Sequence, residues 1–201
     1  MTLAPLVVAL LVAWQDGCRE ATRDRLAAAL EAARHDGPLA AMGLLPEPHT
    51  DPGCVPLAVA RHSLLGWRTA RDAARAGGTP VSLVWAGAAA SDLERLAETH
   101  PEAAYAHAVV RAAMAAAQDE RPEMGVFLDH ARAVAARAPR PPAWPAPIDL
   151  VEAELWMEVD VYEAACAAYR RVLDAGLVEG GQAARIAGIL AGRRCTGTGA
   201  R

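Results

Sequence analysis

Four polar side chains share one face of a helix that the sequence predicts to begin near Pro101. His100, His107, Arg111 and Gln118 are separated by close to whole or double helical turns, so they lie along one side of that helix. Such a face suits recognition of a peptide carboxylate. It suits a metal ion less well, because histidines seven residues apart are awkward ligands for one ion. The alternative is the solvated side of an amphipathic helix.

Other residues with reactive side chains do not form a catalytic pattern. Glu154 and Glu158 lie one helical turn apart, but a catalytic carboxylate pair needs burial or a facing partner to separate the two pKa values, and we expect both side chains to be exposed. Asp129 and His130 are adjacent, so on a helix they point about 100° apart. Gly77-Gly78 precedes no Lys-Ser/Thr pair and is no phosphate loop. We predict no catalytic residue and no cofactor, and we favour a protein that is not an enzyme.

The four cysteines indicate disulfides or packing positions and no metal site. Cys18, Cys54, Cys166 and Cys195 are widely spaced, with no CxxC pair and no histidine at ligand spacing. In an exported chain they suggest two disulfides, Cys18–Cys54 and Cys166–Cys195. Lipidation of Cys18 would instead leave three thiols, one of them unpaired. A cytosolic chain would keep all four reduced, in helix packing positions.

The region 1–17 contains an apolar run, Leu3 to Trp14, with the length of a signal-peptide core. No Arg or Lys precedes this run, and Gln15 and Asp16 stand where a cleavage site needs small or aliphatic residues. The region is therefore either a signal or lipoprotein-type segment or the first buried helix of a cytosolic fold. We slightly favour the cell envelope, periplasm or secretion over the cytoplasm, with membrane contact only through this region.

Composition predicts an all-α fold. Hydrophobic residues make up 53% of the 201 residues, and alanine is the commonest of them, whereas aromatic residues make up 4%. Alanine favours helices and offers little packing surface to a sheet. All 20 basic residues are arginine, as expected from a GC-rich genome, and the net charge is −4. Because the arginines alternate with acidic residues and form no basic stripe, we predict no nucleic-acid partner.

The pattern of caps and breakers divides the chain into regions. Helices are expected at 19–35, 55–76, 101–118, 122–138 and 181–192, with capping boxes at Ser91–Glu94 and Thr99–Glu102 marking further helix starts. Residues 79–86 are ambiguous and favour a helix or a buried turn. Prolines at 139–147 indicate a stiff extended linker, which could also be a polyproline ligand. The predicted regions are 18–98 (N-terminal helices), 99–138 (a degenerate hairpin), 139–147 (linker), 148–193 (a second hairpin and a capping helix) and 194–201 (a frayed tail).

The second hairpin, over residues 149–193, resembles the tetratricopeptide repeat family. Small and aromatic residues alternate where its two helices should touch, at Ala153, Trp156, Tyr162, Ala165 and Tyr169. Close helix approach requires alanine on one side, and the aromatic rings fill the adjoining gaps. Asp160-Val161 replaces the usual Gly-Asp turn, and the expected proline after the second helix is absent. The resemblance implies stacked antiparallel hairpins, a short solenoid or an irregular right-handed superhelix.

The same resemblance implies a scaffold or adaptor that binds a protein or peptide on the concave surface formed by the first helix of each hairpin. On that view, the partner contacts are His107, Arg111, Glu154 and Glu158. Two other functions stay open. One is a small helical enzyme, or enzyme accessory protein, with a pocket lined by Trp67, Trp85 and His107. The other is a cytosolic regulatory module.

Overall fold

The computed structural model describes residues 17–75, 80–138 and 142–196. Within these ranges the chain is helical and contains no strand, which confirms the all-α prediction. The apolar run from Leu3 to Trp14 lies outside the described residues. The helices are α2 (Glu20–Asp36), α3 (Pro38–Met42), α4 (Val55–Arg75), α5 (Pro80–Ala97), α6 (Pro101–Ala117), α7 (Arg121–Arg137), α8 (Ile148–Glu158), α9 (Tyr162–Asp174), α10 (Gly180–Ala191) and α11 (Arg193–Thr196), with a short 3-10 helix at Pro48–Thr50.

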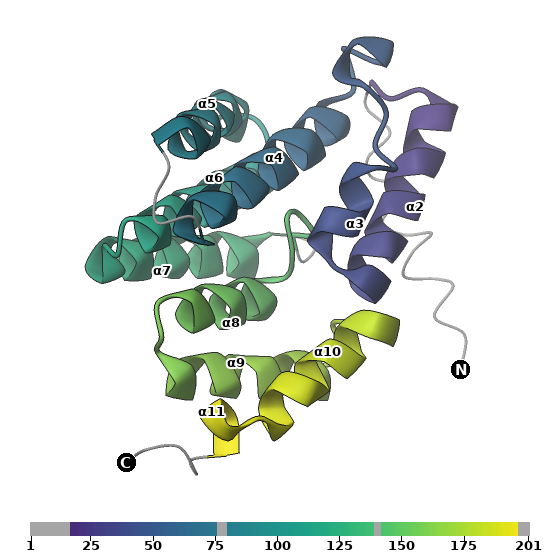
Figure 1. Cartoon of the computed structure of the whole chain (residues 1–201). Coiled ribbons are helices and arrows are strands. Elements are labelled where there is room, and N and C mark those ends of the chain that lie inside the picture. Colours follow the sequence, from purple (N-terminus) through teal and green to yellow (C-terminus); the bar gives the residue numbers. More distant parts are fainter. Residues whose placement is uncertain (1–16, 76–79, 139–141, 197–201) are drawn as a thin grey trace.

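Six of these helices form three stacked hairpins, α4/α5, α6/α7 and α8/α9 (Figure 1). Helix α6 packs against both helices of the first hairpin, and α8 packs against both helices of the second. The two short turns at Asp119 and Asp160 place these residues at φ 56° and 60°, a left-handed conformation that aspartate tolerates better than most residues. Adjacent helix pairs therefore stack in the manner of a helical repeat fold.

Small residues let these helices approach closely. In α6, most of the buried side chains are alanines, including Ala108, Ala112 and Ala113. Gly66 of α4 faces Val110 of α6, and a Cβ atom at Gly66 would lie only 2.8 Å from the Val110 methyl groups. The alanine-rich composition thus sets the short distance between the first two hairpins.

The two ends of the described chain meet at α2 and α10 (Figure 1). The backbone N–H of Glu179 donates to the carbonyl oxygen of Arg34, and the Arg34 guanidinium lies 2.5 Å from the Glu179 carboxylate. Helix α10 also packs on α9, as expected for a helix that caps the last hairpin. It therefore joins the third hairpin to the first helices of the chain.

Two predicted capping boxes are wrong. Ser91 lies inside α5, because the run of alanines before it contains no residue that would break the helix begun at Pro80. Helix α6 does begin at Pro101, but His100 is its N-cap and provides no side-chain bond. The Thr99 hydroxyl instead donates to the carbonyl oxygen of Leu96, and Glu102 accepts the N–H of Ala143 at 3.2 Å.

The proline-rich segment is not a free spacer in its described part, residues 142–147. Trp144 is fully buried in a cluster with Leu26, Leu57 and Leu64, so it joins α2 to α4. The Tyr105 hydroxyl donates to the carbonyl oxygen of Ala146 at 2.6 Å. The segment therefore packs into the interior, where its WPAP sequence is unavailable as an extended ligand; residues 139–141 lie outside the described ranges.

Candidate functional site

Arg111 lies on α6, and its side chain is exposed. Its guanidinium stacks on the ring of Phe127 from α7, with 4.9 Å from the guanidinium carbon to the ring centroid. No carboxylate of the described residues forms an ion pair with it. Stacking fixes the position of the guanidinium while leaving its N–H donors free, an arrangement that suits an anionic group.

His107 lies one turn before Arg111 and is partly buried. Burial lowers the pKa of His107; Glu94 on α5 opposes this shift, while Arg111 and His130 on α7 add to it. The imidazole is therefore neutral near pH 7 and stands among groups from three helices. We call the exposed side of α6, with His100, His107, Arg111 and Gln118, the α6 strip.

The residues of the α6 strip lie along α6, with His100 as its N-cap and Gln118 as its C-cap. His100 is partly exposed at the start of the helix, and exposed Gln118 donates to the carbonyl oxygen of Met114 at 3.2 Å. Phe127 and His130 were missed as neighbours of the strip. The signal was available: α6 and α7 run antiparallel about the turn at Asp119, so residues equally distant from that turn face each other.

The expectation that Glu154 and Glu158 are exposed is wrong. Their side chains are 6% and 13% exposed, and Arg71 of α4 lies between them. Its guanidinium is 2.6 Å from Glu154 and 2.5 Å from Glu158, and it also lies 5.2 Å from the centre of the Trp67 ring. The Arg71 side chain thus reaches from α4 to a face of α8 that sequence spacing alone leaves open.

Arg185 of α10 completes this group by pairing with Glu154. We call Arg71, Glu154, Glu158 and Arg185 the inner ion cluster. Burial raises the pKa of Glu154, but Arg71 and Arg185 outweigh burial, so that this pKa is lowered. Burial also raises the pKa of Glu158, and Arg71 opposes this only in part.

The two carboxylates therefore have separated pKa values, a feature that buried ion-pair networks share with catalytic sites. Here Glu154 is fully engaged, since it also accepts a hydrogen bond from the Tyr169 hydroxyl, whereas the buried Oε2 atom of Glu158 has no hydrogen-bond partner. The inner ion cluster ties α4, α8 and α10 together. The neighbours of His107 and Arg111 come instead from α5 and α7, and no described contact joins these two residues to Glu154 or Glu158.

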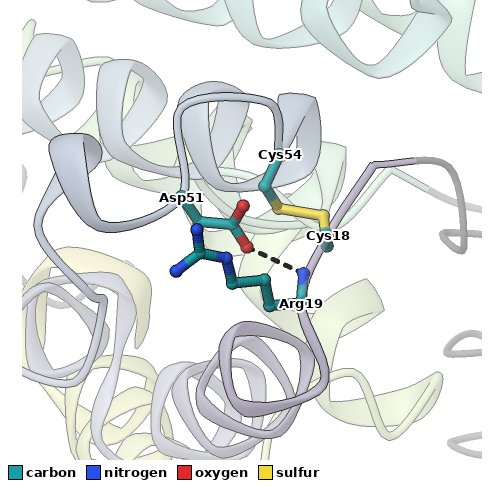
Figure 2. The surroundings of a disulfide bond; sticks show 4 residues. All are labelled: Cys18, Arg19, Asp51 and Cys54. Atoms are coloured by element: carbon teal, nitrogen blue, oxygen red, sulfur yellow. Dashed lines mark hydrogen bonds between the residues drawn. A yellow bond between two sulfur atoms is a disulfide. The ribbon is translucent and has the colours of Figure 1, made fainter.

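A disulfide between Cys18 and Cys54 fastens the start of α2 to the start of α4 (Figure 2). Beside it, buried Asp51 accepts the backbone N–H of Arg19 at 2.8 Å. Bonds from the Arg19 backbone and the Thr22 hydroxyl lower the pKa of Asp51. Because the N-cap residue Arg19 makes no side-chain cap bond, Asp51 serves as a cap from a distant loop.

The second disulfide joins Cys166 of α9 to Cys195 of α11. These are the pairs that the sequence suggested for an exported chain. Nearby, Arg194 stacks on the ring of Tyr162 at 4.8 Å, and the Tyr162 hydroxyl donates to Asp160. The disulfide holds the end of the described chain on the last hairpin.

The residues predicted to pack this hairpin take different positions. Ala153, Ala165 and Tyr169 are buried and Trp156 is partly buried in the core, whereas Tyr162 lies on the α11 side.

The three residues proposed for an enzyme pocket differ in their exposure to solvent. Trp67 is fully buried in the core, whereas Trp85 is 57% exposed on α5.

The described residues contain neither a metal-binding group nor a membrane-spanning helix. Among them, no three His, Cys, Asp or Glu side chains are grouped to hold a metal ion. No described helix has both the length and the apolar character needed to span a bilayer. Comparisons of the chain with protein-family models, with curated proteins and with solved structures found no match.

Proposed function

We propose that the protein is a non-enzymatic scaffold of helical-repeat type that binds a protein or peptide segment along the α6 strip. The observation that carries the proposal is Arg111, whose exposed guanidinium is held on Phe127 and has no carboxylate partner among the described residues. In contrast, the arginines of the inner ion cluster are neutralised within the fold. A fixed and unpaired charge is available to a partner.

The stacked hairpins support this proposal, because helical arrays present extended surfaces for protein recognition. The resemblance of the third hairpin to the tetratricopeptide family points the same way. The proposed binding surface differs from the concave surface that this resemblance implied. Glu154 and Glu158 form ion pairs with Arg71, so they are not available to a partner. We therefore assign partner binding to His107 and Arg111.

We also propose that the scaffold works in an oxidising compartment, such as the cell envelope, the periplasm or the extracellular space. Two disulfides are typical of such compartments and rare in the cytosol. The Cys18–Cys54 bond uses the Cys18 thiol, so it is an alternative to lipidation of that residue. This location separates the scaffold from a cytosolic regulatory module.

Selection of random peptides against the full-length chain tests the proposed binding surface. Selected peptides should bind Arg111→Glu at least about tenfold more weakly than the parent, as expected for loss of a charged hydrogen-bonding group and introduction of repulsion. The matched control is Arg25→Glu on α2, where the arginine is exposed and makes no ion pair with the described residues. Equal binding by the parent and Arg111→Glu would refute the assignment.

A further inference from the structure

A row of apolar side chains lies exposed along the first half of α5. Val81, Val84 and Trp85 are 67%, 70% and 57% exposed, and Ala88 is exposed as well. The spacing of these residues places them on one face of the helix. Helix α5 packs against α4 and α6 and lies at the edge of the hairpin array (Figure 1). We call these four residues the α5 apolar face.

The α5 apolar face is an exception among the second helices of the three hairpins. The exposed positions of α7 include Glu123 and Asp129, and those of α9 include Glu163. In contrast, residues 80–91 of α5 contain no charged side chain. Exposed helix faces normally carry charges, and a contiguous exposed apolar patch marks an interaction surface. The α5 apolar face therefore suits contact with another uncharged surface.

We infer that the α5 apolar face binds the same face of a second copy of the chain, with the two α5 helices antiparallel about a twofold axis. This inference concerns self-assembly. It goes beyond the proposed binding of a protein or peptide segment at the α6 strip and does not depend on it.

The order of the residues on this face supports pairing with itself. Residues 81 and 88 are equally distant from the midpoint between residues 84 and 85. A twofold axis at that midpoint sets Val81 against Ala88 of the second copy, and Val84 against Trp85. Each larger side chain then meets a smaller one, which lets the two helices approach closely.

The charges farther along α5 favour the antiparallel arrangement. Asp92 and Arg95 lie on the same face, one and two turns beyond Ala88, and form an ion pair with each other. A parallel pairing would bring each of these charges close to its equivalent in the second copy, which is unfavourable. The antiparallel pairing places both charges beyond the apolar contact, at its solvent-exposed rim. An apolar centre with a polar rim is the usual composition of a protein interface.

The size of the face sets the expected strength of the dimer. A stable and specific dimer buries about 800 Å² on each partner. Four side chains on one helix supply only part of such an area, and the remainder would come from the less apolar flanks. We therefore expect a weak dimer, with a Kd of about 10–100 μM.

Sedimentation velocity of the full-length, disulfide-bonded chain, from about 1 to about 500 μM, tests the inference across the expected Kd. We expect the sedimentation coefficient to rise from that of a monomer to that of a dimer. Val84→Glu should weaken the dimer at least about tenfold, because the contact would bury an unpaired charge. The matched control is Val126→Glu, a similarly exposed valine on α7, which should leave the dimer unchanged. Circular dichroism and thermal unfolding establish that both variants are folded.

Disulfide cross-linking under mild oxidation tests the orientation of the two helices. In the antiparallel dimer, Val81→Cys of one copy lies opposite Ala88→Cys of another, so a mixture of the two variants should form a cross-linked dimer. Each variant alone should not, because equivalent positions are then separated by about 10 Å along the helix axis, too far for a disulfide. Cross-linking of each variant with itself, and not with the other, would overturn the antiparallel pairing.

The other outcomes are also decisive. A chain that stays monomeric at the highest concentration overturns the inference, and so does a dimer that persists in Val84→Glu. A monomeric chain that sediments with phosphatidylcholine vesicles, and loses this binding in Val84→Glu, would overturn it in favour of a lipid surface. None of these results affects the proposed function, which the peptide affinity of Arg111→Glu tests separately.

Discussion

The inner ion cluster and the α6 strip use similar residues in opposite ways. On α8, Glu154 and Glu158 both pair with Arg71 of α4, and Glu154 also pairs with Arg185 of α10. On α6, Arg111 is exposed, and its one described interaction is with an aromatic ring. Helical spacing indicates a polar face in both cases. What differs is whether another part of the chain covers that face.

The energetic consequences differ accordingly. Removing one member of a buried ion cluster leaves an unpaired charge in a poorly solvated place, which is strongly unfavourable. An exposed charge is screened by water and contributes little to folding. Substitutions in the inner ion cluster should therefore affect stability, and substitutions on the α6 strip should affect binding.

Arg71→Ala should cause the largest loss of stability. It removes the partner shared by Glu154 and Glu158 and also the stacking on Trp67, and we expect about 3–5 kcal/mol of destabilisation. Urea unfolding measures this loss. The control is Arg68→Ala in the same helix, where the exposed guanidinium lies 3.6 Å from Asp72 and contributes about 0.5 kcal/mol or less. Equal losses in the two variants would show that the inner ion cluster does not hold the hairpins together.

The two disulfides hold the two ends of the described chain on the array, and each should contribute to the free energy of unfolding. Replacing Cys18 and Cys54 by serine, or Cys166 and Cys195 by serine, should each destabilise the fold by about 2–4 kcal/mol. The two costs should be similar, because the sequence separations of 36 and 29 residues are similar. Thermal unfolding of each variant against the oxidised parent gives the comparison.

Intact-mass analysis of the native protein serves as the control for redox state. Each disulfide lowers the mass by that of two hydrogen atoms. A fully reduced native protein with unchanged stability would contradict the disulfide account and the proposed oxidising compartment.

Glu102 sharpens the comparison, because it is a partly buried acid that accepts a hydrogen bond from the backbone N–H of Ala143. Burial raises the pKa of Glu102 from 4.5 to about 7, and the bond from Ala143 opposes this shift. The folded protein therefore binds this proton more tightly than the unfolded chain does. The resulting stability is fully present below about pH 4.5 and is lost as the pH rises through 7.

Glu102→Gln should remove that dependence on pH. We expect the variant to match the parent near pH 4.5 and to exceed its stability at pH 8 by about 1–3 kcal/mol, given 1.36 kcal/mol for each pKa unit. Urea unfolding at the two pH values measures the difference. A stability gain that is the same at both pH values would contradict the role of burial at Glu102.

Local patterns predicted much of the fold. Hydrophobic spacing, prolines at helix starts and the alanine-rich composition placed α2, α4, α6, α7 and α10 within about two residues of their observed bounds. Ser91 misled the prediction, because a capping residue is effective only where the chain is not already helical. The helix that carries the α6 strip was also predicted, since its start at Pro101 and its end near Gln118 are marked in the local sequence.

Tertiary contacts explain what the sequence alone could not reveal. Glu154 and Arg71 lie far apart in the chain, and nothing local indicates that α4 covers α8. Trp144 lies in a segment whose prolines indicate exposure, yet its large apolar ring is buried against α2 and α4. Asp51 caps a helix 32 residues away. Each of these depends on how distant helices pack.

The affinity of the Arg111→Glu variant for peptides selected against the parent, measured beside its free energy of unfolding, tests the central distinction most directly. The account predicts that binding falls at least about tenfold while stability changes by no more than about 0.5 kcal/mol, because an exposed charge contributes little to folding. Binding equal to that of the parent, or a loss of stability as large as that of Arg71→Ala, would contradict it.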